Sequence, residues 1–134
     1  MITLVDSNVI LDLVTDDPHW SQWSAEALSR AADESTLAIN SLIYAEVSIG
    51  FTTVEELEHL LPAEEFQRLA LPYEAAFLAG KAFLAYKRKG GKRSAPLADS
   101  YIGAHAAVSG LRLLTRDARR YRTYFPKVDL IAPG

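Results

Sequence analysis

The sequence predicts an α/β fold: one domain with a central, mostly parallel five-stranded sheet flanked by helices on both faces. Three observations predict it. The chain has 134 residues, 49% of them hydrophobic, which is enough for one well-buried core and short for two, so residues 1–134 are expected to form a single domain. Short apolar segments of strand type alternate with helical segments. The first of them, residues 2–5, leaves no room for polar alternation, which is typical of a strand buried on both faces.

The first part of the chain supplies two strands and three helices. Asp6 follows the first strand, and Ser7 and Asn8 offer capping side chains for the helix that comes next. The Asp16-Asp17-Pro18 segment breaks this helix, and Asn40 can cap the third one. The predicted elements are a strand at 2–5, a helix from residue 7, a helix at 19–32, a strand at 36–39 and a helix at 42–49.

The remainder of the chain supplies three more strands and the other helices. Pro62 closes a glutamate-rich helix, and Pro96 suits the first turn of a later one. The clearest amphipathic helix is expected to place Tyr73, Phe77 and Phe83 in the core. The predicted elements are helices at 54–61, 73–88 and 96–109, a turn or short helix bearing Arg119, Arg120 and Arg122, and strands at 66–69, 112–115 and 128–131.

The net charge of −3 hides a marked asymmetry. Residues 1–80 carry 14 acids and 2 bases, a charge of −12, whereas residues 81–134 carry 3 acids and 12 bases, a charge of +9. This division predicts a basic surface on the C-terminal part that attracts a polyanion. The alternative is that the two halves neutralise each other across the fold.

Several classes of protein are excluded by composition. The chain has no cysteine, which removes disulfides, thiolate metal sites and cysteine nucleophiles and fits a cytoplasmic protein. No apolar run approaches the about 20 residues that span a bilayer, so no membrane association is expected. The sequence lacks a P-loop and a G-x-G-x-x-G motif, and no two of its histidines, at 19, 59 and 105, have metal-ligand spacing.

Four acidic residues stand out as candidates for a functional site. Asp6 and Asp117 each follow a predicted strand, where ligands of open α/β sheets gather. Asp99 lies near a helix start, where the helix dipole stabilises an anion. Glu46 lies in an apolar helix, where an unpaired carboxylate is costly to bury. A purely structural alternative is that Asp6 caps the following helix.

Clustered carboxylates need a cation. Two unit charges about 4 Å apart repel by about 4 kcal/mol at an effective dielectric constant of about 20. All-oxygen ligands favour Mg²⁺, with Mn²⁺ as a substitute, over Zn²⁺. Such a metal polarises a phosphodiester, generates hydroxide and stabilises the leaving oxygen. The acids therefore predict metal-assisted hydrolysis of phosphodiester bonds.

These motifs together resemble PIN-domain ribonucleases, specifically the VapC-type toxin of a VapBC toxin–antitoxin pair. The resemblance covers nearly the whole chain, through LVDSNVILD, SLIYAEVSIGF, PLADSYIGAHA and LLTRD. Each motif alone is weak, whereas their order and spacing are specific. By position, the resemblance implies that Asp6, Glu46, Asp99 and Asp117 form the catalytic Mg²⁺ site.

The resemblance implies further properties. Ser7, Asn8 and Thr115 would orient the carboxylates, as metal sites commonly require. The protein would be a Mg²⁺-dependent endoribonuclease acting on RNA such as tRNA. It would form a homodimer and be neutralised by a VapB-type antitoxin whose C-terminal segment enters the active-site groove.

Basic residues of the C-terminal part are expected to contact RNA phosphates beside an acidic centre that would otherwise repel RNA. These candidates are Lys87, Arg88, Lys89, Lys92, Arg93, Arg116, Arg119 and Arg120. The alternative for residues 87–93 is a solvated connector, and the alternative for Arg116 is an ion pair with Asp117 or Glu46.

Two other functions compete with the nuclease. The first is a catalytically silent PIN-like module that holds a basic partner peptide in its acidic groove; binding alone would not require all four acids. The second is a Mg²⁺-dependent phosphatase or phospho-acceptor domain, which commonly has paired acids around the first strand and a lysine after a late strand. The sequence has Ser7 and Asn8 after Asp6 and no such lysine.

Overall fold

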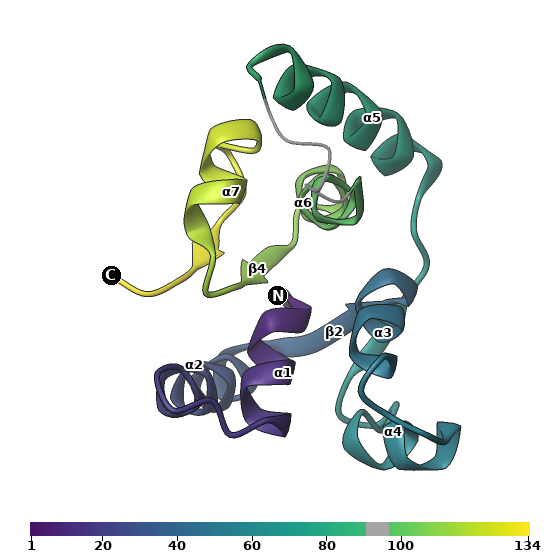
Figure 1. The fold of residues 1–134 in the computed structure, drawn as a ribbon, viewed down its shortest axis with the longest axis vertical. Coiled ribbons are helices and arrows are strands. Elements are labelled where there is room, and N and C mark those ends of the chain that lie inside the picture. The colour runs from purple at the N-terminus through teal and green to yellow at the C-terminus, as the bar shows by residue number, and fades with distance from the viewer. Residues whose placement is uncertain (91–96) are drawn as a thin grey trace.

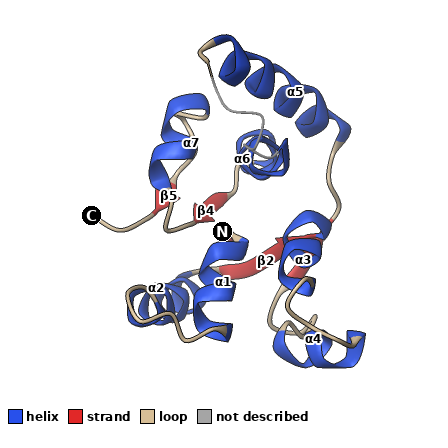
Figure 2. Cartoon of the chain, viewed as in Figure 1, coloured by secondary structure: helices blue, strands red, loops and turns tan. Residues whose placement is uncertain are grey.

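The computed structural model describes residues 1–90 and 97–134 and has the predicted α/β architecture. Its sheet contains five strands in the order β3-β2-β1-β4-β5, and every described pair is parallel. Figure 2 shows the strands between the helices. The strands are β1 (Ile2–Val5), β2 (Thr36–Asn40), β3 (Gln67–Leu69), β4 (Arg112–Leu114) and β5 (Leu130–Ile131).

Helices cover both faces of this sheet, as predicted. Figure 1 shows α1 and α2 on one side and α5, α6 and α7 on the other. The described helices are α1 (Ser7–Val14), α2 (Ser21–Glu34), α3 (Ser41–Ser48), α4 (Val54–Leu60), α5 (Tyr73–Arg88), α6 (Leu97–Ser109) and α7 (Ala118–Tyr124). None of the helices in the described part of the chain has the length and hydropathy needed to cross a bilayer.

Strand β1 lies at the centre of the sheet and is buried on both faces, as its apolar sequence predicts. Leu4 and Val5 have no exposed surface. The chain builds outward from β1 through β2 to β3, and then returns to place β4 on the other side of β1. This reversal of strand order opens a crevice at the carboxyl ends of β1 and β4, the usual ligand position in open parallel sheets. Asp6 and Asp117 follow these two ends.

Side-chain caps fix two helices that start at this edge. Asp6 is the N-cap residue of α1, so the capping alternative for this residue is correct as a description of its backbone position. Asn40 caps α3 by accepting a hydrogen bond from the Ile43 N–H at 2.9 Å. The Asn40 amide also pairs with Nδ1 of His105 at 3.0 Å, in the interior of the protein. His105 is therefore a core residue.

The predicted core face of α5 is wrong. Tyr73 is 92% exposed and Phe77 is 70% exposed, whereas Ala75, Ala79 and Ala82 are buried. Helix α5 packs on α6 through these alanines, because small side chains let two helix axes approach closely. The periodicity of the large apolar residues identified a stripe of α5, but the side of the helix that packs on α6 is the alanine stripe.

Candidate active site

Asp6 is the most completely fixed acid of the chain. Its side chain is buried and accepts four hydrogen bonds. The Ser7 N–H binds Oδ1 at 2.8 Å, while Oδ2 accepts from the Asn8 amide at 3.4 Å and from the hydroxyls of Thr115 and Tyr121 at 2.9 Å each. These donors come from α1, the end of β4 and α7, so three separate segments hold one carboxylate.

Glu46 lies beside Asp6 although it comes from α3. The Ser7 hydroxyl donates to Oε1 of Glu46 at 2.9 Å, so Ser7 binds both acids, one through its backbone and one through its side chain. Glu46 is half-buried. Among the described residues no base pairs with this carboxylate, which is half-buried and lies beside the end of β1.

Asp99 and Asp117 are joined by an arginine that the chain itself provides. Arg120 on α7 donates to Oδ2 of Asp99 and lies 3.4 Å from Oδ2 of Asp117. Asp99 is in the first turn of α6, and Asp117 is the N-cap residue of α7. The Arg120 side chain is half-exposed, whereas that of Asp99 is largely buried. Arg120 thus lies between two of the predicted acids instead of projecting freely as a phosphate contact.

The four acids behave as one electrostatic group. Burial raises the pKa of Asp6 and of Glu46, and it raises the pKa of Asp99 to about 6. For Asp99, the Arg120 guanidinium lowers the pKa, and the charges of Asp6, Glu46 and Asp117 raise it again. The ionised states of Asp6, Glu46 and Asp99 are disfavoured by burial, and those of Glu46 and Asp99 also by neighbouring acids, so this site favours an additional positive charge.

The donor set suits Mg²⁺ or Mn²⁺, but the side chains are not arranged as a closed metal site. In the described parts of the chain, no three acidic or histidine side chains are gathered closely enough to hold a metal ion as they stand. The acids form two pairs: Ser7 binds Asp6 and Glu46, and Arg120 binds Asp99 and Asp117. All four contribute only carboxylate oxygens, the ligands that hard divalent cations prefer. Closing the two pairs around an ion would require Arg120 to turn away, which its half-exposed side chain permits.

Residues 7, 8 and 115, predicted to orient the carboxylates, all contact Asp6. Thr115 is the most connected of them, because its hydroxyl donates to Asp6 and accepts from the Asp117 N–H at 3.0 Å. The Asn8 amide also donates to this hydroxyl at 3.2 Å. Thr115 thus links Asp6 to the backbone of Asp117 and fixes their relative positions.

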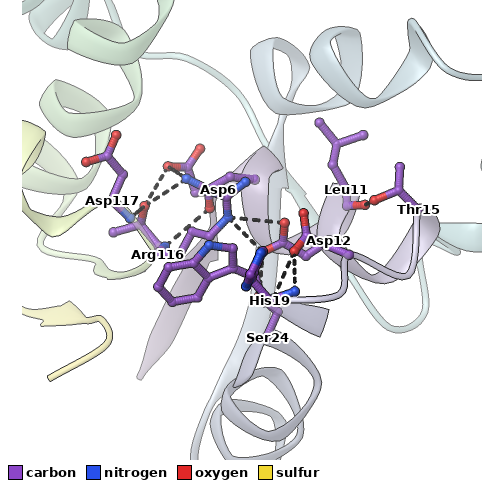
Figure 3. Close-up of polar contacts among 12 residues, drawn as sticks. Asp6, Leu11, Asp12, Thr15, His19, Ser24, Arg116 and Asp117 are labelled. Atoms are coloured by element: carbon purple, nitrogen blue, oxygen red, sulfur yellow. Dashed lines mark hydrogen bonds and ion pairs between the residues drawn. The ribbon is translucent and has the colours of Figure 1, made fainter. Parts of the chain in front are cut away.

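Arg116 has a different partner from the two that the sequence suggested. It does not pair with Asp117 or Glu46. Its Nε donates to both carboxylate oxygens of Asp12, at 3.1 and 2.9 Å, and its guanidinium lies 5.6 Å from the ring centroid of Trp20. Figure 3 shows the Arg116 side chain directed toward Asp12 beside the Asp6 cluster.

The other basic candidates occupy different surroundings. Lys87, Arg88, Lys89 and Arg119 are exposed at the end of α5 and on α7. Lys92 and Arg93 lie outside the described residues.

Sequence reasoning missed Tyr121 and Asp12. Tyr121 is almost fully buried, and its hydroxyl contact with Asp6 is one of the four that fix this acid. Its position one helical turn after Asp117 was an available signal, because residues i and i+4 share a helix face. No sequence spacing points to Asp12, because its partner Arg116 is distant in the sequence.

The raised pKa of Asp99 predicts a pH effect on stability. The folded protein holds this proton more tightly than the unfolded chain, because the pKa rises from 3.8 to about 6 on folding. Asp99 therefore favours the folded state most below its unfolded value, and that contribution is lost as the pH rises through about 6. Urea denaturation in EDTA should give Asp99→Asn a growing stability advantage over the unmodified protein between these values. Exposed Asp33→Asn should follow the unmodified protein; a constant offset for Asp99→Asn would contradict the shift.

Comparison with known proteins gives the family of this chain. The PIN domain family model matches residues 3–126. Comparison with curated proteins gives no match.

Solved structures share the fold over the full chain. A chain of the VapBC2 structure from Rickettsia felis, bound to a promoter DNA fragment, has a TM-score of 0.74 at 19% identity, with 100% of both chains covered. VapBC-1 from nontypeable Haemophilus influenzae gives 0.73 at 18% identity, covering 98% of each chain. FitAcB from Neisseria gonorrhoeae gives 0.70 at 21% identity, covering 98% of this chain and 96% of that one. The family model match over most of the sequence, on the fold and the acidic edge described above, means that the chain belongs to the PIN domain family.

Proposed function

We propose that this protein is a Mg²⁺-dependent endoribonuclease toxin that acts in the cytoplasm and is neutralised by a VapB-type antitoxin. The observation that carries the proposal is the meeting of Asp6, Glu46, Asp99 and Asp117, from four distant segments, at one edge of a PIN domain. Three of these acids have a pKa raised first by burial. Acids that share one edge of the sheet and are partly desolvated are what a divalent-cation site supplies as ligands.

The chain's own residues would prepare the site for a phosphodiester. Ser7, Thr115 and Tyr121 hold Asp6 in one orientation, so the position of this carboxylate is set before a cation binds. Asp99 and Asp117, once released by Arg120, would close the other side together with Glu46. Bound Mg²⁺ would polarise the phosphate and activate a water molecule for attack. Arg120, displaced but tethered on α7, would then lie close enough to meet the negative phosphate.

Removal of the metal tests this function. Incubation of total RNA with the protein in Mg²⁺ should give discrete cleavage products, and excess EDTA should abolish them because carboxylates alone cannot activate water for attack on a phosphate. Adding Mg²⁺ or Mn²⁺ back should restore cutting. Cleavage that continues in EDTA would refute the metal-dependent mechanism.

The antitoxin proposal rests on the structural neighbours and on Arg120. The matched structures are described as VapBC complexes from Rickettsia felis and Haemophilus influenzae. In this chain the acids already accept a guanidinium, so an arginine of a partner segment has the chemistry to occupy the same place. The peptide-binding alternative draws on this observation too, and the RNA assay separates the two functions.

We also propose a homodimer formed through α5. The exposed apolar residues Tyr73, Phe77 and Leu84 lie along one stripe of this helix, the surface expected of an interface. A charge at its centre should break the association, so Phe77→Glu should convert the dimer to a 14.8 kDa monomer in size-exclusion chromatography with light scattering. Val54→Glu, at another exposed apolar position on α4, should remain dimeric. A monomeric unmodified protein would refute the proposal.

A further inference from the structure

A cleft beside the acids is lined by aromatic rings. Its volume is about 430 Å³, and it lies between α5, α6 and α7 with Asp99 and Asp117 in its wall. Figure 1 shows these three helices side by side. The rings come from Phe83 and Tyr86 on α5 and from Tyr121, Tyr124 and Phe125 at the end of α7. The proposed catalytic edge therefore continues directly into an aromatic cleft.

Lysines lie over two of these rings. The Lys87 Nζ lies 5.8 Å from the ring centroid of Phe83, and the Lys89 Nζ lies 5.6 Å from that of Tyr124. Both rings are only half-buried. Cations at this distance are held by the negative face of the ring, so the two lysines at the end of α5 are held over rings that line the cleft. Arg119 adds a further positive charge to its wall.

We propose that this cleft binds one unpaired nucleotide of an RNA strand, beside the phosphodiester that the acidic edge would cleave. The base would stack on Tyr124 and Phe83 in place of the lysines that lie over these rings, and Lys87 and Lys89, so displaced, would contact the flanking phosphates. The inference deepens the proposed function and rests on it for the position of the cut. It identifies the substrate as RNA that is single-stranded at this position.

The composition of the cleft favours a nucleotide over other occupants. Aromatic faces combined with a basic rim are the pattern by which proteins bind single strands, since every base has a π-face and every linkage has a charge. A volume of about 430 Å³ accommodates one such unit rather than a duplex. A base within a duplex is stacked on both faces and cannot reach these rings.

The charges explain why such a subsite is needed. The acidic edge repels RNA phosphates in the absence of a metal, because Arg120 offsets only part of the charge of the four carboxylates. Lys87 and Lys89 lie over two rings that line the same cleft, and Arg119 adds a positive charge to its wall. RNA would thus be held by the cleft before the reacting phosphate meets the acids.

Binding in EDTA tests this inference without cleavage. The full-length protein is titrated against a fluorescein-labelled single-stranded oligoribonucleotide, and against the same strand annealed to its complement, by fluorescence anisotropy. Tyr124→Ala should weaken single-strand binding about tenfold, whereas Tyr124→Phe, which keeps the ring, should bind within about twofold of the unmodified protein. The duplex should bind more weakly than the single strand.

Lysine variants provide a second measurement that does not depend on a half-buried ring. Lys89→Ala should weaken single-strand binding and reduce the slope of log affinity against log salt by about one. Lys81→Ala is the matched control, because Lys81 lies on the same helix, 5.2 Å from the Phe77 ring and outside the cleft. It should leave both the affinity and the slope unchanged.

The outcomes separate this inference from the nuclease proposal. Single-strand binding unchanged in both Tyr124→Ala and Lys89→Ala, equal affinity for the duplex, or no RNA binding at all would overturn the nucleotide subsite, even if the protein cuts RNA in Mg²⁺. Conversely, Tyr124-dependent binding by a protein that cuts no RNA would refute the nuclease and leave the subsite standing.

Discussion

Replacing Asp6 with asparagine is expected to lower the rate of RNA cleavage by about a thousandfold or more, while the protein stays folded. The amide has the shape of the carboxylate but lacks its negative charge, so it cannot help to hold a divalent cation. The hydroxyls of Thr115 and Tyr121, which donate to Asp6, can rotate and accept from the new amide. The site should therefore keep its geometry and lose its chemistry.

Two companion variants define this result. Asp99→Asn should lose cleavage to a similar extent, whereas Asp33→Asn, which changes an exposed acid on α2, should cut like the unmodified protein. Thermal denaturation in EDTA should give Asp6→Asn a melting temperature equal to or above that of the unmodified protein, because burial raises the pKa of this acid and disfavours its charge. If Asp6→Asn retained more than about a tenth of the activity, this acid would not be part of the catalytic centre.

The RNA cleavage assay also separates the nuclease from the main alternative, a silent peptide-binding module. A silent module that holds a basic peptide would cut no RNA in Mg²⁺, in the unmodified protein or in any variant, and its peptide affinity would fall on substitution of the exposed acids. Asp6 has little exposed surface, so it offers little to a peptide. The burial of this acid is better matched to a small cation.

The fold and the position of the acids were accessible from sequence because both follow from simple rules. An apolar strand without alternation belongs at the centre of a parallel sheet, and β1 is there. Residues that follow neighbouring parallel strands meet at one edge, which brings Asp6 near Asp117. These rules concern the backbone, and they hold whatever side chains surround the site.

The partners of individual side chains were not accessible. Arg120 binds Asp99 and Asp117, and Arg116 binds Asp12, because of where α7 and the loop before it lie in three dimensions. The charge count identified a basic C-terminal part, but it could not show which of these bases form ion pairs with acids of the same chain. The exposed face of α5 was missed for a similar reason, since a helix with both alanine and aromatic stripes has two candidate core faces.

The Asp12–Arg116 ion pair joins segments from the two ends of the chain, and its acid is buried while its arginine is one-third exposed. Asp12 is 2% exposed, and its Oδ2 also accepts from the Ser24 hydroxyl at 2.8 Å. Arg116 follows β4 and donates its backbone N–H to Oδ1 of Asn8 at 3.3 Å. The pair joins α1, α2 and the loop that carries Asp117, as Figure 3 shows for the labelled residues.

Removing one member of this pair should be costly. Arg116→Met keeps most of the side-chain volume and leaves the Asp12 carboxylate buried without its guanidinium partner, so we expect a loss of about 3 kcal/mol in the free energy of unfolding, measured by urea denaturation. Arg119→Met removes an exposed charge from the same region and should change stability by no more than about 0.5 kcal/mol. Adding Asp12→Asn to Arg116→Met should recover part of the loss, because a buried amide costs less than a buried unpaired charge. Equal urea midpoints for Arg116→Met and Arg119→Met would mean that water, rather than Arg116, neutralises Asp12, and the loop before α7 would then need another support.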